Sequence, residues 1–193
     1  AKYDKILYLD CDLIVEGDIS KLYDIELGNC EVAAVRSEDF RLLSKTKSPI
    51  FLEGYPYNVD NYRTEALGMQ VPENYFNAGV LVIDLKKTRQ RINQEQVFEI
   101  LHRHNYKYND QDVLNILFDG RVKVMDCRWN YMTYIPEQIA KENVNNRKLY
   151  EDLYREKPCI IHYTSAEKPW NTETKVLGDR YWKYRNEMEA IYA

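Results

Sequence analysis

The chain has 193 residues, of which 45% are hydrophobic and 30% are charged, and its formal net charge is −4. These values are typical of one globular domain with a sizeable core, and no apolar run approaches the roughly 20 residues that a membrane-spanning helix requires. Lysines and arginines are spread along the chain and form no basic stripe, which argues against nucleic acid as a partner.

The cysteines indicate the compartment. There are four (Cys11, Cys30, Cys127 and Cys159), far apart, without a CxxC pair and mostly in apolar segments. We therefore expect buried, reduced thiols rather than a disulfide framework or a zinc site. Reduced thiols favour a soluble cytoplasmic protein, a location that also allows peripheral association with the inner face of the cell membrane.

The first predicted element is a strand at residues 5–9 (KILYL), with apolar side chains on both faces, as in a central strand covered by helices. Because the chain enters a core strand almost at once, we expect that an N-terminal portion of the native protein, lying beside this strand, is missing from the sequence. A second strand is predicted at 30–36. Residues 37–72 are polar, rich in Tyr, Pro and Gly, and lack a sustained period, so we expect a long functional excursion over the surface.

The second half mixes strands with helices. YFNAGVLVIDL, residues 75–85, predicts a strand that follows a small-residue turn at Ala78 and Gly79. Asn93 and either Asn109 or Asp110 are the expected N-caps of two helices. The remaining predicted elements are helices at 93–104 and 110–118, strands at 121–126 and 158–163, and an amphipathic closing helix at 178–192. This mixture predicts an α/β fold.

ILYLDCDLIV, residues 6–15, places Asp10 and Asp12 at the end of the first strand. Residues i and i+2 of a strand point to the same side, so the two carboxylates converge while Cys11 faces away. A divalent cation would relieve their repulsion, and oxygen ligands suit Mg²⁺ or Mn²⁺. An EF-hand is excluded because of Ile14. Two alternatives stay open: acids that merely face water, and a hydrolase whose first aspartate attacks a phosphate.

PCIIHYTSAEKPW, residues 158–170, contains a second set of candidate residues. His162 follows a short apolar strand, and beside a metal-seeking pair of aspartates it becomes a candidate third ligand, although a core histidine is the plainer interpretation. A nitrogen ligand favours Mn²⁺ over Mg²⁺. Lys168 lies where the same loop can bring its ammonium to a phosphate, and otherwise it is an ordinary solvated lysine. Trp170 is expected to pack.

Two further motifs supply the hydrogen-bonding groups that sugar hydroxyls require. FNAG contains Asn77, and NDQD contains Asp110 and Gln111. Structural roles are equally concrete, because Asn77 can close a turn and Asp110 can cap the helix that follows. The 17 tyrosines also suit stacking on carbohydrate, although most should be core or surface aromatics.

Four blocks in this order, LYLDCDLIV, YFNAGVLVIDL, NDQDVLN and HYTSAEKPW, resemble glycosyltransferase family 8. Its members include bacterial lipopolysaccharide galactosyl- and glucosyltransferases and, more distantly, glycogenin. The resemblance covers nearly the whole chain and implies a single catalytic domain with a partial GT-A fold, the Rossmann-like nucleotide-diphospho-sugar transferase fold, in which helices flank a mixed sheet. It also implies transfer of glucose or galactose from a UDP-sugar to a glycan or lipopolysaccharide-type acceptor, with Mn²⁺ and with retention of configuration.

The resemblance also assigns roles to residues. Asp10, Asp12 and His162 would hold the metal, and Lys168 would contact the diphosphate. The donor sugar would be lined by the FNAG and NDQD positions Asn77, Ala78, Asp110 and Gln111, with Gln111 near the reacting face. No protein nucleophile is obvious, so the resemblance favours a front-face route, in which the acceptor attacks on the side that the phosphate leaves. Residues 37–72 would shape the choice of acceptor.

Two departures from the family pattern matter. Ser165 stands where the family loop HxxGxxKPW has glycine, so a side chain there would alter how closely the backbone approaches phosphate. The family's first βα unit, which carries the uridine-binding residues, precedes the first residue of this sequence. If that unit is absent, a sheet edge is exposed and activity should be weak or absent. An aspartate-nucleophile phosphohydrolase and a catalytically inactive sugar-binding or scaffold fragment therefore remain as alternatives.

Overall fold

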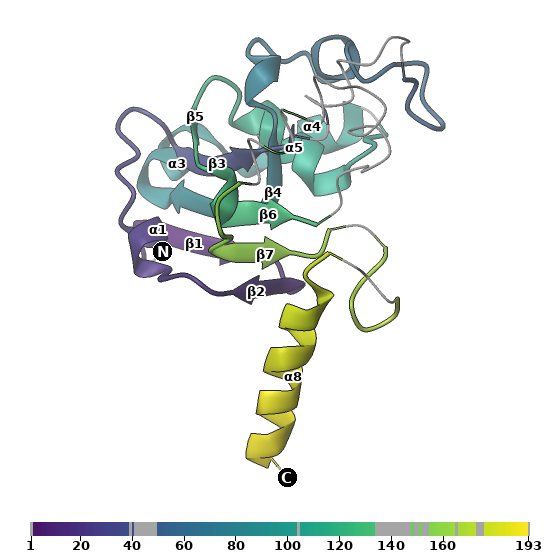
Figure 1. Cartoon of the computed structure of the whole chain (residues 1–193). Coiled ribbons are helices and arrows are strands. Elements are labelled where there is room, and N and C mark those ends of the chain that lie inside the picture. The colour runs from purple at the N-terminus through teal and green to yellow at the C-terminus, as the bar shows by residue number, and fades with distance from the viewer. Residues whose placement is uncertain are drawn as a thin grey trace.

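Helices and strands alternate along the chain in a mixed α/β arrangement, seen in a computed structural model (Figure 1). The structure describes residues 2–38, 40, 50–103, 105–133, 148, 151, 155–164, 166–172 and 176–192. The strands are β1 (Lys5–Leu9), β2 (Leu13–Val15), β3 (Val32–Arg36), β4 (Phe76–Asp84), β5 (Val122–Val124), β6 (Tyr131–Met132) and β7 (Ile160–His162). The helices are α1 (Ser20–Tyr23), α3 (Leu85–Arg91), α4 (Gln94–Arg103), α5 (Asn109–Leu117) and α8 (Gly178–Tyr192), with single turns η1 (Tyr62–Ala66), η2 (Pro72–Asn74) and η3 (Cys127–Asn130).

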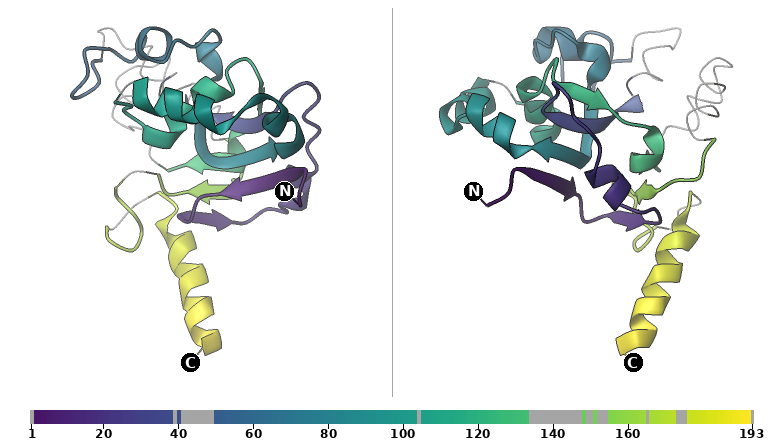
Figure 2. Two further views of the ribbon diagram at one scale, coloured as in Figure 1. Left: turned by 180° about the vertical axis from the view of Figure 1, so that it is seen from behind. Right: turned by 90° about the vertical axis from the view of Figure 1, so that its left-hand side faces the viewer.

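The strands form two sheets. In the four-stranded sheet the order is β1-β4-β3-β5, with β1 and β3 antiparallel to β4 and with β5 parallel to β3. In the three-stranded sheet the order is β2-β7-β6, with β2 antiparallel and β6 parallel to β7 (Figures 1 and 2). β4 and β7 therefore each have a partner strand on both sides. β4 begins, and β7 ends, beside the segment that contains Asp10 and Asp12.

The core lies on both faces of the four-stranded sheet. Successive residues of β3 and β4 point to opposite faces, so an unbroken apolar run serves two clusters. One cluster contains buried Ala33, Val35, Val80 and Val82 together with Leu22, Trp129 and Ile160. The other contains Val32, Ala34, Phe76, Leu81 and Phe118.

The position of β1 corrects the prediction of a central strand. β1 lies at the edge of its sheet, and Tyr8 is 43% exposed. The strand is nevertheless apolar because Leu7 and Leu9 pack against the first core cluster. The open sheet edge expected from the sequence is thus present at β1 among the described residues.

The predicted turn at Ala78 and Gly79 is also wrong. β4 runs without interruption from Phe76 to Asp84, and the Gly79 carbonyl accepts a hydrogen bond of 2.9 Å from the backbone N–H of Asp10. The small residues therefore lie inside an extended strand. There they permit the close approach of other groups, as the site shows.

One of the predicted helix caps is confirmed. The Asn93 side chain accepts a hydrogen bond of 2.9 Å from a backbone N–H in the first turn of α4. Neither Asn109 nor Asp110 caps α5, since Tyr108 holds the N-cap position and Asn109 has a positive φ of 48°. The buried carboxylate of Asp112 instead accepts a 2.8 Å hydrogen bond from the Tyr108 N–H.

The segment between β3 and β4 differs from the predicted surface excursion. Residues 39 and 41–49 lie outside the described residues, but the remainder packs inward. Tyr62 is 1% exposed. Tyrosines can be buried in this way because the ring is apolar and only the hydroxyl needs a hydrogen-bond partner. The resulting aromatic cluster contains Phe40, Leu52, Val59, Tyr62, Leu67, Met69, Tyr75, Tyr106 and Val113.

The cysteines are free thiols, but they are not buried as expected. Cys11 is exposed, and the other three have intermediate exposure. The apolar character of the surrounding segments therefore did not predict how deeply the cysteine side chains are buried.

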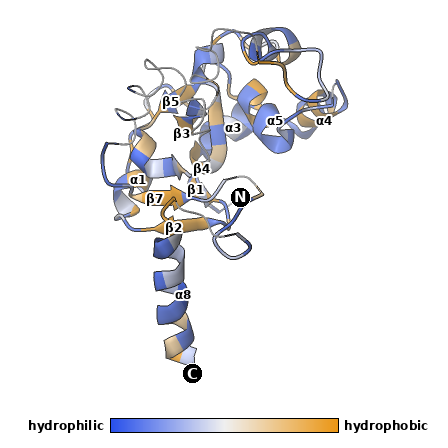
Figure 3. Ribbon diagram, turned by 45° about the vertical axis from the view of Figure 1, so that its right-hand side comes forward, coloured by the Kyte–Doolittle hydropathy of each residue, from blue (hydrophilic) through white to orange (hydrophobic). Residues whose placement is uncertain are grey.

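The C-terminal helix forms at the predicted residues, and its first turns contact the body through Tyr181, which packs against Tyr163 and Trp170. α8 projects away from the rest of the chain in three views (Figures 1 and 2), and its ribbon is mostly hydrophilic (Figure 3). Its apolar residues Trp182, Met188 and Ile191 are 45%, 50% and 78% exposed. No helix in the described part of the chain combines the length and the apolar character needed to cross a membrane.

Candidate metal centre

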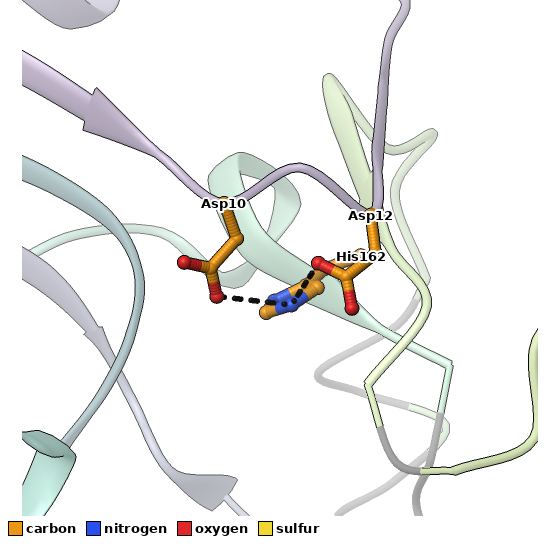
Figure 4. Close-up of side chains that lie close together, drawn as sticks. All are labelled: Asp10, Asp12 and His162. Carbon is orange, nitrogen blue, oxygen red and sulfur yellow. Dashed lines mark ion pairs between the residues drawn. The ribbon is translucent and has the colours of Figure 1, made fainter.

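Three side chains from two distant segments meet beside the end of β7. Asp10 and Asp12 lie in the connection between β1 and β2, and His162 is the last residue of β7 (Figure 4). His162 Nε2 lies 3.2 Å from Asp12 Oδ1 and 3.6 Å from Asp10 Oδ2. One ligand atom from each residue lies within 4.8 Å of the other two, so a single cation can contact all three.

The convergence of these residues comes from strand pairing. The sequence placed both aspartates on one strand, but Asp10 and Asp12 follow β1 without belonging to a strand. β2 then pairs with β7 so that Leu13 is opposite His162, and Tyr163 N–H donates to the Asp12 carbonyl at 3.1 Å. This antiparallel register holds Asp12 against the imidazole.

Gly79 makes room for the histidine. A Cβ built on Gly79 would lie 2.7 Å from His162 Nδ1, closer still to His162 Cε1, and 2.9 Å from Asp10 Oδ2. Any side chain at this position of β4 would therefore fill the space that the imidazole occupies. The donor set of two carboxylates and one imidazole fits Mn²⁺ or Mg²⁺, with the nitrogen favouring Mn²⁺.

Lys168 and His162 both stabilise the negative charge of the Asp12 carboxylate. The ammonium of Lys168 lies 2.5 Å from Asp12 Oδ2 and also donates to the Tyr163 carbonyl. Burial acts to raise the pKa of Asp12, but hydrogen bonds from His162 and Lys168 outweigh it and hold that pKa well below its usual range. Asp12 is therefore a carboxylate at any ordinary pH, as metal binding requires.

Tyr8 orients the other carboxylate, a role that the sequence analysis missed. Its hydroxyl donates to Asp10 Oδ1 at 2.8 Å, so Oδ2 faces His162. This hydrogen bond, together with partial burial and the charges of Asp10 and Asp110, raises the pKa of Tyr8 to about 12. The exposed side chain of Asp110 therefore lies close enough to Tyr8 to act on its hydroxyl electrostatically.

Three of the predicted donor-sugar residues form one hydrogen-bonded group. Gln111 Oε1 accepts from Asn77 Nδ2 at 3.0 Å and from the Ala78 N–H at 3.2 Å. Asn77 and Gln111 remain partly exposed, whereas Ala78 is 7% exposed and offers mainly its backbone. Ser165 lies outside the described residues.

Asn130 connects this group to the metal cluster. It is fully buried at the end of η3, where Oδ1 lies 2.8 Å from His162 Nδ1 and Nδ2 donates to Asn77 Oδ1 at 2.8 Å. The sequence around it, RWNY, has no metal-binding spacing, so no motif signals its position. Only the fold brings it between two predicted site residues.

The chain is similar in sequence to known proteins. A family model described as Glycosyl transferase family 8 matches residues 1–174. General stress protein A of Bacillus subtilis (strain 168) is 30% identical over 186 residues, which cover 93% of this chain and 58% of that protein. Lipopolysaccharide 1,2-glucosyltransferase of Escherichia coli (strain K12) is 31% identical over 185 residues, or 93% of this chain and 48% of that protein. The chain thus spans about half the length of these curated relatives.

Solved structures share the fold. The bifunctional glycosyltransferase WbbM superposes with a TM-score of 0.74 at 29% identity, covering 92% of this chain and 32% of WbbM. The galactosyltransferase LgtC, solved in complex with donor and acceptor sugar analogues, superposes with a TM-score of 0.65 at 30% identity, covering 95% of this chain and 61% of LgtC.

Proposed function

Because the chain belongs to glycosyltransferase family 8, we propose that it transfers glucose or galactose from a UDP-sugar to a glycan or lipopolysaccharide-type acceptor. The transfer is Mn²⁺-dependent and retains the anomeric configuration. The mixed α/β fold is of the GT-A type, as the sequence predicted. A cytoplasmic location, at the inner face of the membrane if the acceptor is a lipopolysaccharide precursor, belongs to the same proposal.

The observation that carries this proposal is the convergence of Asp10, Asp12 and His162 on one point. These three residues would hold the cation. When bound, a divalent ion would neutralise negative charge on the departing diphosphate. The partial exposure of both aspartates, 35% and 18% for their side chains, leaves a side open to a ligand.

The remaining residues of the site supply binding and orientation. Lys168 lies beside Asp12 and can turn its ammonium to a diphosphate oxygen, where charge develops as UDP leaves. Asn77 and Gln111 are partly exposed, and each amide NH₂ keeps one proton beyond its printed hydrogen bond that can donate to a sugar hydroxyl. Asp110 stands at the start of α5 with an exposed carboxylate that can accept from a sugar hydroxyl. We propose a front-face transfer, in which these groups hold the donor while the acceptor approaches from the leaving side.

The two alternatives make different predictions. An aspartate-nucleophile phosphohydrolase needs a further acidic pair near the metal, whereas the group that meets Asp10 and Asp12 in the described residues contains a histidine. An inactive sugar-binding fragment would keep donor and metal binding without turnover. Neither alternative is favoured by an observation of its own.

The test uses the full-length gene product with radiolabelled UDP-glucose and UDP-galactose, Mn²⁺ and a broad set of acceptors. We expect transfer or slow donor hydrolysis with one UDP-sugar, loss of that activity in Asp12→Ala, and little change in Asp24→Ala, an exposed aspartate in the turn after α1. If the wild type shows neither transfer nor hydrolysis, or if Asp12→Ala is as active as wild type, the proposed function is wrong. A phosphoaspartate trapped at Asp10 would support the phosphohydrolase instead.

A further inference from the structure

A continuous series of side-chain hydrogen bonds runs from the metal cluster into the interior. It begins at His162, passes through three amide side chains and a tyrosine, and ends at a fully buried carboxylate. Its members, in order, are His162, Asn130, Asn77, Gln111, Tyr75 and Asp112. Because amides donate at one end and accept at the other, such a series can carry a fixed direction.

The direction is set at the buried end. Asp112 is 0% exposed, and its carboxylate accepts from the Tyr62 hydroxyl and the Tyr75 hydroxyl, each at 2.6 Å, and from the Tyr108 N–H at 2.8 Å. The Tyr75 proton is therefore directed at Asp112. Its oxygen is left to accept from Gln111 Nε2 at 3.0 Å, which turns the other end of the amide, Oε1, away from Tyr75.

Backbone groups confirm this direction at two further points. An N–H of the main chain can only donate, and the Ala78 N–H points at Gln111 Oε1 at 3.2 Å. The Gly79 N–H likewise points at Asn77 Oδ1 at 3.0 Å. Asn77 Nδ2 must therefore face Gln111, as it does at 3.0 Å. The orientations of the Asn77 and Gln111 amides thus follow from backbone N–H groups, which can only donate.

The last step reaches the metal cluster. Since Asn77 Oδ1 is an acceptor, Asn130 turns Nδ2 toward it at 2.8 Å, and Asn130 Oδ1 is left facing His162 Nδ1 at 2.8 Å. An amide oxygen only accepts, so His162 Nδ1 carries a proton. The other ring nitrogen, Nε2, faces Asp12 Oδ1 and Asp10 Oδ2.

We propose that Asn130 is a positioning residue of the metal site. Through this series it keeps a proton on Nδ1 of His162. Nε2, which hydrogen-bonds to Asp12 in this structure, is then the nitrogen whose lone pair a divalent cation shared with Asp10 and Asp12 would take. The same amide ties the orientation of Gln111, which faces the sugar site, to that of the histidine. The inference rests on the metal site of the proposed function but not on sugar transfer.

The expected effect follows from how metal ligands are supported. A histidine ligand is fixed in tautomer and orientation by the partner of its second nitrogen, and removing that partner lowers metal affinity by about 10- to 100-fold. Asn130 is fully buried, so no water can simply replace it without opening the core. Asn130→Ala should therefore bind Mn²⁺ about 10- to 100-fold more weakly than wild type.

The test needs two variants and one control. Asn130→Asp retains an oxygen that accepts from His162 Nδ1 but sets its second oxygen against Asn77 Oδ1, so it should bind Mn²⁺ more tightly than Asn130→Ala while being less stable than the wild type. Asn115→Ala is the matched control, because Asn115 is also fully buried but bonds to the backbone of Phe76 and Gln111. Mn²⁺ binding is measured on the folded full-length protein from the electron paramagnetic resonance signal of free Mn²⁺, without any sugar substrate.

The tautomer gives an independent readout that needs no variant. Long-range ¹H–¹⁵N correlations of the metal-free wild type should show a proton on His162 Nδ1. A bare Nδ1 overturns the proposal even if every variant misfolds. It is overturned as well if folded Asn130→Ala binds Mn²⁺ as tightly as wild type, or if Asn115→Ala loses as much affinity. Loss of sugar transfer with normal Mn²⁺ binding and an intact Nδ1 proton would contradict the proposed function alone.

Discussion

Replacement of Gly79 by alanine should disturb the candidate metal site more than any other single methyl group. The added Cβ would lie 2.7 Å from His162 Nδ1 and 2.9 Å from Asp10 Oδ2. Non-bonded heavy atoms rest about 3.5 Å apart or more, so the imidazole must retreat by at least roughly 0.8 Å, and by more at Cε1, which is closer still. β4 itself cannot yield easily, since it pairs with a strand on either side.

Two consequences of this displacement can be measured. Overpacking in a rigid interior costs about 1–3 kcal/mol of unfolding free energy. Ligand positions in a metal site tolerate shifts of only about 0.2 Å, so Mn²⁺ affinity should fall at least about tenfold, or about 1.4 kcal/mol. Urea denaturation gives the first quantity, and titration with Mn²⁺ gives the second.

Gly17→Ala is the matched control for this substitution. Its Cβ would lie 2.7 Å from the Cβ of Cys159, a comparable clash beside β7 that does not involve the imidazole. It should lower stability while leaving Mn²⁺ affinity within about twofold, because the ligands themselves do not move. Equal loss of affinity in both alanine variants would refute the reasoning.

A double-mutant cycle tests the identity of the clashing group. In a His162→Ala background the clash with the imidazole is gone and only the terminal Oδ2 of Asp10, at 2.9 Å, stays close, so Gly79→Ala should cost clearly less there than in the wild type. The same cost in both backgrounds would mean that the added methyl group meets something other than the histidine.

The partly buried thiol of Cys127 and the exposed thiol of Cys11 should differ in their rates of alkylation, and the partly buried and the exposed ion pairs should differ in their contribution to stability. Burial raises the pKa of the Cys127 thiol to about 11, so roughly one molecule in a thousand carries the reactive thiolate at pH 8. Iodoacetamide should therefore modify exposed Cys11 first, with Cys127 becoming reactive only as the pH approaches 11, and equal rates at pH 8 in peptide mass spectra would contradict this. Arg91→Met should cost about 1.5–3 kcal/mol in urea denaturation, because it removes two 2.7 Å contacts from the buried carboxylate of Glu31 and leaves Arg121, at 3.3 Å, as its remaining partner. Arg103→Met, in an exposed pair, should change little.

Much of the secondary structure was predictable because its signals are local. The apolar run of β4, the helical spacing of α4 and α5 and the Asn93 cap depend on neighbours within four residues. Where the signal was local but ambiguous, prediction failed. Small residues at Ala78 and Gly79 are typical of turns, yet in β4 they make space for an imidazole that arrives from β7.

Strand order and burial depth needed the tertiary structure. The apolar KILYL segment could not distinguish a central strand from an edge strand, since β1 at the edge still packs Leu7 and Leu9 into the core. The tyrosine-rich segment before β4 looked like a surface loop because its residues have no period. Its burial depends on Tyr62 meeting Asp112, 50 residues away.

The sequence by itself was enough to predict the family and to nominate the residues of the candidate metal site. Two aspartates spaced by one residue, a histidine at a strand end and a lysine in the following loop nominated a metal and phosphate site. Only the tertiary structure brought Asp10, Asp12 and His162 within 4.8 Å, through the pairing of β2 with β7. It alone supplied Tyr8 and Asn130, because a neutral hydroxyl or amide has no distinctive spacing. The role of such a hydroxyl or amide depends on which nitrogen or oxygen atom the fold places within hydrogen-bond distance of it.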